Sequence, residues 1–384
     1  MKMLYIANAR IPTEKAHGIQ IMKTAEAFAA AGVGVELVLP RRHNRFKGLD
    51  PFAYYGLNRR FPIRFLPSLD VTRLRLFGHP AFVLQQISFS FIVAVWLLGQ
   101  RADVYYFRDL LAASWFSRLC RRGAVGVEIH SVSPRRARFY RALSFRVGRL
   151  VAISHGVQDA LLVCGVAAEK ITVAPDGVDL ASFERTLNRA EARTMLNLPA
   201  HAHLVVYAGN LFPWKGVDTL IEATPDLPEG TEVIFVGGSP DQLARARRFV
   251  QSRAIDHVQF VGHQLPTDVP QYLAAADVLV LPTSAREPIG ARFTSPLKLF
   301  EYMAVGRPIV ASDVPSSREV LTGETAIFVR ADSPSSLAEG IGRALRDPEF
   351  SAKISKKAHE VVKSYSWANR VRFILASFDN EATR

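Results

Sequence analysis

Residues 294–312, TSPLKLFEYMAVGRPIVAS, read as a helix followed by a buried strand, and we interpret the rest of the chain from this stretch. Ser295 is a favourable helix N-cap, and Pro296 suits the first helical turn. Gly306 is typical of a helix end, and the apolar run 309–311 favours a buried parallel strand. The stretch therefore predicts one unit of a parallel α/β sheet.

The start of this predicted helix has the features of an anion site. Its first amide groups have no partner within the helix, and Lys298 adds a positive charge close to Pro296 and Leu297. Glu301 follows one turn later, where it can accept two hydroxyl groups of a ribose while phosphates lie at the helix end. An exposed glutamate on an amphipathic helix is the alternative reading of Glu301.

The segment SPLKLFEYMAVGRP resembles the nucleotide-sugar-binding motif of the family 4 glycosyltransferases. The resemblance assigns Glu301 to the ribose of the donor. The family motif has a first glutamate eight positions earlier, where this chain has Phe293. Glu287 is the nearest acid that can replace it, so Glu287 is a candidate catalytic residue and Phe293 a candidate for the sugar side of the site.

Apolar runs that alternate with helical segments extend the α/β pattern over the chain. In the first half, strands are predicted at 4–7, 35–39, 103–107, 125–129, 151–154 and 171–175. After a break at 184–203, strands are predicted at 205–209, 233–237, 258–261, 278–282 and 309–311. We expect an α/β protein of two facing Rossmann-like domains with a cleft between them, the GT-B architecture that the resemblance implies.

The expected domains divide the two substrates. Residues 1–183 with 367–384 form an N-terminal acceptor-binding domain, onto which the last helix crosses back. Residues 184–366 form a C-terminal domain that binds the nucleotide-sugar donor.

Three residues of the first half are candidates for the acceptor side. Gly18 precedes the predicted helix 20–31, where a doubly wound sheet places ligands, although a glycine before a helix is common without any function. His130 directly follows a predicted strand and therefore lies at the sheet edge where active sites cluster. The resemblance places Gly18, Arg108 and His130 at the sugar and acceptor, with His130 in a catalytic role.

The loop 209–216, GNLFPWKG, resembles the Gly-Arg-Leu-x-x-x-Lys-Gly loop of the family and is placed to meet phosphate. Lys215 occupies the lysine position, whereas Asn210 replaces the arginine, and Arg292 or Lys298 can compensate. The resemblance also implies that the nucleobase lies near His263. The donor-binding residues that we assign are Asn210, Lys215, His263, Ser295, Pro296, Leu297, Lys298 and Glu301.

Composition indicates a folded protein, because 49% of the 384 residues are hydrophobic and 22% are charged. Two distant cysteines, Cys120 and Cys164, predict neither a disulfide framework nor a zinc site and fit a reducing compartment. The apolar run at the N-terminus is short for a signal peptide and reads as a strand. Because the chain has no Asp-x-Asp pair, we expect no metal, and no cofactor beyond the nucleotide-sugar co-substrate.

The net charge of +13 comes entirely from the first half. Residues 1–183 hold 25 basic and 12 acidic residues, whereas residues 184–384 hold 23 of each. Basic residues mix with aromatic residues at 41–75, which predicts an anionic membrane surface or a phosphate-bearing substrate as a partner; a solvated basic face is the alternative. We expect a cytoplasmic protein, peripheral on the inner face of the cytoplasmic membrane.

Two further segments stand out. Residues 81–98 carry no charge and have the length of a membrane span, but Gln85 and Ser90 interrupt them and a strand follows, so we predict a helix packed on the sheet. A helix lying against a bilayer is also compatible with this sequence. Residues 41–79 look irregular, and their length predicts a functional excursion.

The order of the motifs implies a retaining transferase that moves a sugar from a nucleotide diphosphate to an acceptor hydroxyl, with lysines and helix amides stabilising the departing diphosphate. We expect a glycan or lipid-linked acceptor and no nucleic acid, because no RNA-binding module is recognisable. The alternatives are a nucleotide-sugar epimerase or a phosphorylase of the same fold, and a non-catalytic nucleotide-sugar-binding protein. The sequence leaves the sugar, the base, the acceptor and the oligomeric state open.

Overall fold

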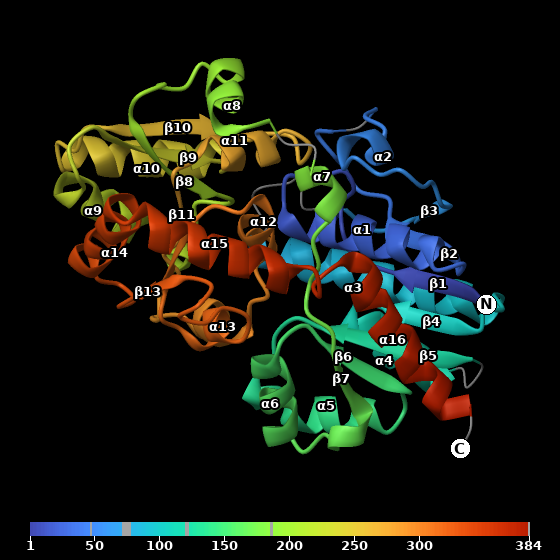
Figure 1. Cartoon of the computed structure of the whole chain (residues 1–384). Helices are drawn as coiled ribbons and strands as arrows, with labels where there is room; N and C mark the ends of the chain where they lie inside the picture. Colours follow the sequence, from blue (N-terminus) through green and yellow to red (C-terminus); the bar gives the residue numbers. More distant parts are fainter. Residues whose placement is uncertain (47, 71–77, 120–122, 185–186, 383–384) are drawn as a thin grey trace. The chain divides into compact units, whose positions relative to one another are not determined.

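The computed structural model describes residues 1–46, 48–70, 78–119, 123–184 and 187–382. The chain divides into two compact units, one formed by Met1–Pro175 with Trp367–Arg384 and the other by Asp176–Ser366. Both are built on a parallel sheet, and most strands read as near-continuous buried runs because helices cover both of their faces. Two Rossmann-like units of this kind confirm the predicted fold class (Figure 1).

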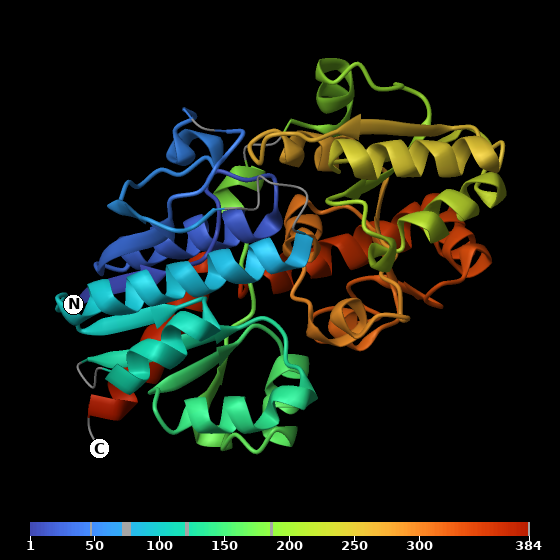
Figure 2. The same cartoon turned by 180° about the vertical axis from the view of Figure 1, so that it is seen from behind.

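In the described residues, the first unit holds a sheet of seven strands in the order β3-β2-β1-β4-β5-β6-β7. The strands are β1 Lys2–Ile6, β2 Gly34–Pro40, β3 Ile63–Leu66, β4 Val104–Phe107, β5 Ala124–Ile129, β6 Arg149–Ala152 and β7 Ile171–Val173. The α-helices are α1 Ala16–Ala30, α2 Pro51–Tyr54, α3 Gly78–Leu98, α4 Leu110–Leu119, α5 Ala137–Ser144, α6 His155–Val163 and α16 Trp367–Ala382. Helices α1 and α16 lie together on one face of the sheet, and α3 and α4 lie together on the other (Figures 1 and 2).

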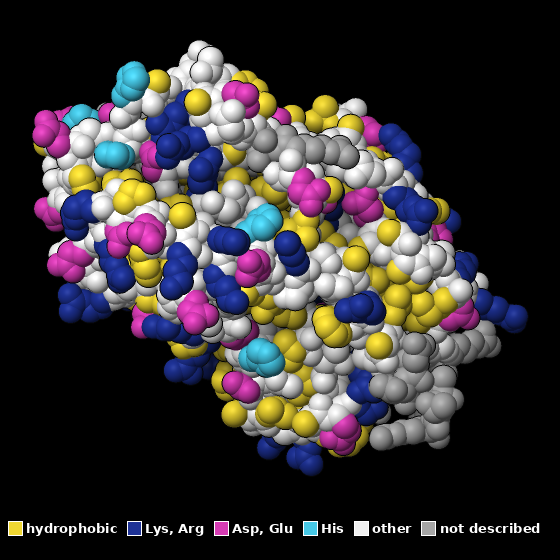
Figure 3. Space-filling model, viewed as in Figure 1, with side chains coloured by type: hydrophobic (Ala, Val, Ile, Leu, Met, Phe, Trp, Pro, Cys, Tyr) yellow, Lys and Arg dark blue, Asp and Glu magenta, His cyan; other side chains and the backbone are white. Residues whose placement is uncertain are grey.

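The second unit holds a sheet in the order β10-β9-β8-β11-β12-β13. Its strands are β8 His203–Ala208, β9 Thr231–Val236, β10 Val258–Gly262, β11 Val278–Leu281, β12 Ile309–Ser312 and β13 Ile327–Val329. Its α-helices are α7 Leu180–Glu184, α8 Arg189–Met195, α9 Val217–Ala223, α10 Pro240–Ser252, α11 Val269–Ala275, α12 Leu297–Val305, α13 Pro315–Arg318, α14 Pro334–Arg346 and α15 Pro348–Val362. Over α14 and α15, Lys and Arg side chains are interspersed with Asp and Glu (Figure 3).

The boundary between the units lies earlier than the sequence predicts, because the second unit begins at Asp176 rather than after residue 183. The Val178 amide donates to the Tyr365 carbonyl over 2.9 Å, and Val178 also forms a parallel bridge with Ser366. Phe183 packs into the core of the second unit. These contacts between distant residues draw the start of the segment into the second unit.

Residues 41–79 contain more regular structure than predicted. β3 pairs with β2 in the register Leu37↔Ile63, and α2 is capped by Asp50, whose side chain accepts from the Phe52 amide. The sequence did not predict β3, because an edge strand needs no continuous apolar run. Arg64 interrupts its apolar residues and is exposed. Residues 47 and 71–77 of this segment lie outside the described residues.

Helix α3 is a packed helix of the first unit, as predicted. By length and composition, residues Pro80–Leu98 also qualify as a membrane span, with a mean hydropathy of 2.0 and 39% of the window buried inside the protein. Hydropathy alone therefore does not distinguish a membrane span from a packed helix in α3.

Candidate active site

The candidate donor site in the second unit is formed where loops after β8, β9 and β11 meet the start of α12. A Cβ atom on Gly216 would lie 1.6 Å from the Pro282 carbonyl oxygen, and one on Gly237 would lie 2.5 Å from the Gly209 carbonyl oxygen. Only glycine allows the strand ends to approach this closely, and both residues also have a positive φ. A Cβ atom on Gly209 would lie 3.8 Å from Lys298 Nζ, so Gly209 lies beside the Lys298 ammonium group.

Lys298 is a buried cation in the first turn of α12, with 8% of its surface exposed. Its Nζ lies 3.6 Å from the centroid of the Tyr207 ring and has no hydrogen-bond partner in the described part of the chain. Burial lowers the pKa of Lys298 well below its ordinary value, the positive charge of Lys215 adds to this, and Glu301 opposes it.

Lys215 ends the 3-10 turn Pro213–Lys215, and its Nζ lies 4.4 Å from the centroid of the Trp214 ring. Burial lowers the pKa of Lys215 to about 8. Two partly desolvated ammonium groups that repel each other favour an anion between them, because its charge would restore the ordinary pKa of both. The predicted assignment of Lys215 and Lys298 to one site therefore agrees with their electrostatics.

Glu301 lies one turn after Lys298 on α12. Burial raises the pKa of Glu301 to about 7, and Lys298 opposes this rise. The carboxyl group is therefore poised between its two protonation states near neutral pH. In its ionised form, it can accept hydrogen bonds from two hydroxyl groups.

The start of α12 differs from the prediction at Ser295. Pro296, in an extended conformation, is the N-cap, and no side chain caps the helix. The Ser295 hydroxyl instead accepts from the Asp176 amide over 3.1 Å. Because Pro296 has a ψ of 115°, outside the helical range, the helix begins at Leu297 and Ser295 lies one residue before the N-cap. Leu297 is buried, so it can offer a ligand its backbone amide rather than its side chain.

The remaining donor-side candidates lie on loops. The Asn210 carbonyl accepts from the Tyr207 hydroxyl over 2.7 Å, and His263 is exposed directly after β10. Phe293 ends the π-helical turn Ile289–Phe293. Glu287 is exposed, and its backbone carbonyl accepts the Gly290 and Ala291 amides at the start of that turn. The roles of these four residues stay predictions.

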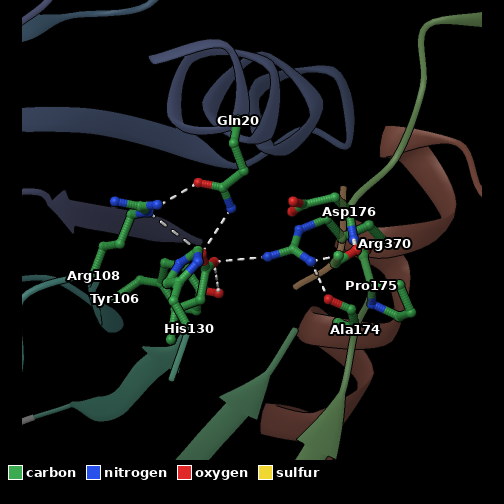
Figure 4. A network of polar contacts seen from close by, with 10 residues as sticks. Gln20, Tyr106, Arg108, His130, Ala174, Pro175, Asp176 and Arg370 are labelled. Atoms are coloured by element: carbon green, nitrogen blue, oxygen red, sulfur yellow. Dashed lines mark hydrogen bonds and ion pairs between the residues drawn. The ribbon is translucent and has the colours of Figure 1, made fainter. Parts of the chain in front are cut away.

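A buried carboxylate organises the candidate site of the first unit (Figure 4). Glu128 lies at the end of β5 with its side chain inaccessible to solvent. Its hydrogen-bond partners are Gln20 Nε2 at 2.7 Å, His130 Nε2 at 2.6 Å, the Tyr106 hydroxyl at 2.7 Å and Arg370 Nη2 at 2.8 Å. Arg108 Nε adds an ion pair at 3.6 Å. Burial alone would raise the pKa of Glu128, but Arg370 and His130 hold it well below the ordinary value.

His130 is oriented by this carboxylate. The Glu128 carboxylate accepts a hydrogen bond from Nε2 of His130. The neutral imidazole therefore carries its proton on Nε2, and Nδ1 is left as an acceptor. Burial and the nearby charge of Arg108 lower the pKa of His130 to about 4, although Glu128 opposes this shift. His130 is therefore neutral at physiological pH, and 28% of its side chain remains exposed for a ligand.

The first unit brings Arg108 to His130, and it packs Gly18 against Tyr55, while the predicted role of Gly18 at the acceptor stays a prediction. Arg108 Nε donates to Gln20 Oε1 over 3.0 Å. Gly18 lies inside the first turn of α1, where a Cβ atom would meet the Tyr55 hydroxyl at 2.2 Å. The close neighbour of Gly18 is thus a side chain of the protein. His17, the preceding residue, has its pKa lowered to about 3 by burial and by Arg108.

Sequence reasoning missed Gln20, Tyr106, Glu128 and Arg370. A signal existed for Glu128, since an acid interrupts the apolar strand AVGVEI two positions before His130, and residues two apart share one face of a strand. No comparable signal marked Arg370, which comes from α16. Among the described residues, no group of three His, Cys, Asp or Glu side chains is arranged to hold a metal ion.

The fold and these sites define a glycosyltransferase-like protein of the GT-B class. The structure matches sucrose-phosphate synthase from Thermosynechococcus elongatus with a TM-score of 0.79, over 100% of this chain and 99% of that chain, at 22% identity. It matches HepE from Anabaena, solved in complex with UDP and glucose, with a TM-score of 0.75 over 99% of each chain, at 19% identity. At these identities, the likeness shows a shared fold.

Two glycosyltransferase family models match the chain, which confirms the resemblance to the family 4 glycosyltransferases. The family described as "Glycosyltransferase Family 4" matches residues 18–182, and the one described as "Glycosyl transferases group 1" matches residues 202–347. The two matches thus cover most of both units.

Curated relatives include the D-inositol 3-phosphate glycosyltransferases of Salinispora tropica and Jonesia denitrificans. The first is 29% identical over 224 residues, with 54% of this chain and 45% of the relative covered. The second is 30% identical over 228 residues, with 55% of this chain and 51% of the relative covered. The chain thus spans about half the length of these relatives.

Proposed function

We propose that this protein transfers a sugar from a nucleotide diphosphate sugar to an acceptor hydroxyl with retention of the anomeric configuration. The observation that carries the proposal is the pair Lys215 and Lys298, two desolvated ammonium groups beside Glu301 at the carboxyl edge of the second sheet. Open α/β sheets bind ligands at this edge. Family membership and the UDP complex of HepE support the same class of donor.

The reaction breaks the bond between the anomeric carbon and the diphosphate oxygen and forms one to the acceptor oxygen. The bond electrons leave with the diphosphate, and Lys215, Lys298 and the first amides of α12 stabilise this charge. The proton of the acceptor hydroxyl leaves with the diphosphate or enters solvent. Because lysines can supply the positive charge, we propose that transfer needs no metal ion.

His130 serves the sugar and acceptor side in this proposal. Its neutral imidazole, with Nδ1 unprotonated, offers a hydrogen-bond acceptor to a sugar hydroxyl. Glu128 acts through His130, because it fixes the tautomer and the orientation of the ring. Arg108 supports the same ring by lowering its pKa.

We further propose an acceptor that carries phosphate and is linked to a lipid, used at the inner face of the cytoplasmic membrane. The curated relatives are named for a phosphorylated acceptor, D-inositol 3-phosphate, which supports the phosphate. The excess positive charge of the first half supports an anionic partner for this unit.

The experiment first measures thermal shifts with UDP, GDP and ADP, and then incubates the protein with the matching sugar donors and lipid-linked acceptors. Transfer with the donor's anomeric configuration, read from the proton coupling constant by NMR, supports the proposal. Activity should survive a chelator. Isomerised donor without transfer would assign the protein to the epimerases, and binding without turnover would make it a binding protein.

A further inference from the structure

The outer face of α3 is apolar along its whole length. Leu84, Ile87, Phe91, Val95 and Leu98 recur at spacings of three and four residues and are 43% to 59% exposed. Such a spacing places them in one stripe along the helix. No Asp, Glu, Lys or Arg occurs between Pro80 and Leu98. An exposed apolar stripe of this kind needs an apolar partner.

The inner face of α3 is fixed to the first unit. Phe89, Val93 and Leu97 are fully buried, and the Ser90 hydroxyl donates to Asp109 Oδ1 over 3.2 Å. Gln85 Nε2 donates to Asn8 Oδ1 over 3.1 Å. Because these contacts hold one side of the helix on the sheet, α3 cannot cross a bilayer without unfolding the unit. Only its outer face is available to a partner.

The apolar stripe continues onto α4, which packs beside α3 (Figure 2). The rings of Phe91 and Trp115 meet edge to face with 6.2 Å between centroids, and Leu119 at the end of α4 is 60% exposed. Phe82 adds a further exposed ring near the start of α3. The apolar surface therefore carries the aromatic residues that are favoured at membrane interfaces.

Arginines lie around this surface. The guanidinium group of Arg64 lies 5.3 Å from the centroid of the Trp96 ring, Arg101 is exposed three residues after α3, and Arg118 is exposed in the last turn of α4. Arg64 also pairs with Glu36. Cations beside an apolar face complement anionic lipid headgroups.

Several of the described arginines in the segment 41–75, whose sequence suggested a membrane surface, are paired with acids. Arg42 lies 3.7 Å from Asp70, and Arg45 lies 3.2 Å from Glu14. Arg60 pairs with Asp50 at 2.6 Å. These pairs offset part of the positive charge of the segment 41–75, so that charge is a weaker basis for membrane binding than the apolar face of α3.

We propose that the outer face of α3, extended by Leu119, docks in the plane of an anionic lipid bilayer. The role of this docking rests on the proposed function, because the docked helix would hold the first unit beside a lipid-linked acceptor. A second copy of the chain fits the surface less well. At about 1.5 Å per residue, α3 is roughly 32 Å long, and a stripe about 10 Å wide covers roughly 300 Å², against about 800 Å² per partner in a typical stable interface.

The test is co-sedimentation of the full chain with vesicles of phosphatidylcholine alone or mixed with phosphatidylglycerol. The test variant combines Leu84→Ser, Phe91→Ser and Val95→Ser. The matched control combines Phe145→Ser and Val163→Ser, which change apolar residues of the same unit that are 77% and 82% exposed but lie outside α3. Circular dichroism and the UDP-induced thermal shift check that every variant is folded.

We expect the wild type and the control to bind the mixed vesicles, and the α3 variant to lose at least tenfold in partitioning. Equal binding by the α3 variant and the wild type, or no binding by the wild type, would overturn the inference. Sedimentation velocity tests the alternative partner, a second copy of the chain. If the wild type forms a dimer that the α3 variant does not form, and the wild type does not bind vesicles, this face is a dimer interface. Vesicle binding by a protein that does not transfer sugar leaves this inference standing and rejects the proposed function.

Discussion

Arg370 in the last helix and Glu128 in the first sheet form a fully buried ion pair, with 2.8 Å between Nη2 and Oε2, across 242 positions of sequence. Arg370 Nη1 also donates to the carbonyl groups of Ala174 and Pro175, where the continuous part of the first unit ends. The pair thus fastens the returning helix to the sheet. Through Glu128, it also positions His130.

Replacing Arg370 by methionine should lower the free energy of unfolding by about 3–5 kcal/mol, because it leaves the Glu128 carboxylate buried without its cation. Urea denaturation of the full chain measures this. Arg372→Met, on the exposed side of the same helix, is the control and should have little effect. Equal losses in the two variants would show that the ion pair is not what fastens α16.

The same pair predicts an acid-sensitive stability. The pKa of Glu128 is depressed in the folded state, so its contribution is present above the unfolded value of about 4.3 and is lost as pH falls below it. The wild type should therefore lose unfolding free energy more steeply than Glu128→Gln as the pH falls below about 4. Parallel pH curves for the two proteins would contradict the depressed pKa.

Lys298→Met should raise the free energy of unfolding while weakening nucleotide binding. Methionine keeps the approximate length of the side chain and removes an ammonium group that is desolvated and lacks a hydrogen bond. We expect a gain of about 1 kcal/mol in stability. UDP affinity, measured by calorimetry, should fall at least tenfold. Lys353→Met, an exposed lysine of α15, should change neither quantity; a loss of stability at Lys298 would refute the account.

UDP affinity should be greatest between pH 7 and pH 8. The pKa of Glu301 is about 7, and its carboxyl group must lose its proton to accept two ribose hydroxyls, so affinity rises as the pH passes this value. The pKa of Lys215 is about 8, and its ammonium group must keep its proton to hold phosphate, so affinity falls above this value. Glu301→Gln should flatten the acid limb and leave the alkaline limb; retention of both limbs would reject the assignment of Glu301.

Glu301→Ala and His130→Ala should separate the two sides of the donor. The first should weaken binding of UDP and of a UDP sugar alike, because both contain the ribose. The second should reduce turnover and leave the affinity for free UDP nearly unchanged, because His130 serves the sugar and acceptor. If calorimetry shows equal losses of UDP affinity in both variants, His130 does not have the assigned role.

Glu287→Gln should reduce the transfer rate more than Glu184→Gln, because Glu287 is the acid that we assign in place of the one missing at Phe293. Both glutamates are exposed, so the second variant is a matched control for the change of charge. Initial rates at saturating donor measure the difference. Equal and negligible effects would leave Glu287 as an ordinary loop residue.

The fold followed from the sequence because its signals are local. Apolar runs such as 278–281 are continuous where strands are covered on both faces, and Gly306, in a left-handed conformation, ends α12 where expected. The spacing within α12 also placed Lys298 and Glu301 one turn apart, and the resemblance of loop 209–216 added Lys215; the donor-binding roles of all three stay predictions. Ser295 was predicted wrongly as the N-cap because Pro296 shifted the helix start.

Only the tertiary structure placed Glu128 of β5 against Arg370, Gln20 and Tyr106, because these three residues come from α16, α1 and β4. It also showed that the space beside Gly18 holds Tyr55, and that Arg42 and Arg45 are paired with acids. The sequence by itself determined most of the alternation of strands and helices, although not the short strands β3 and β13, because backbone preference and apolar periodicity act over a few residues. The burial of an ionisable group and its pairing with other charges depend on segments that are distant along the chain. The pKa of such a group therefore follows only from the tertiary structure.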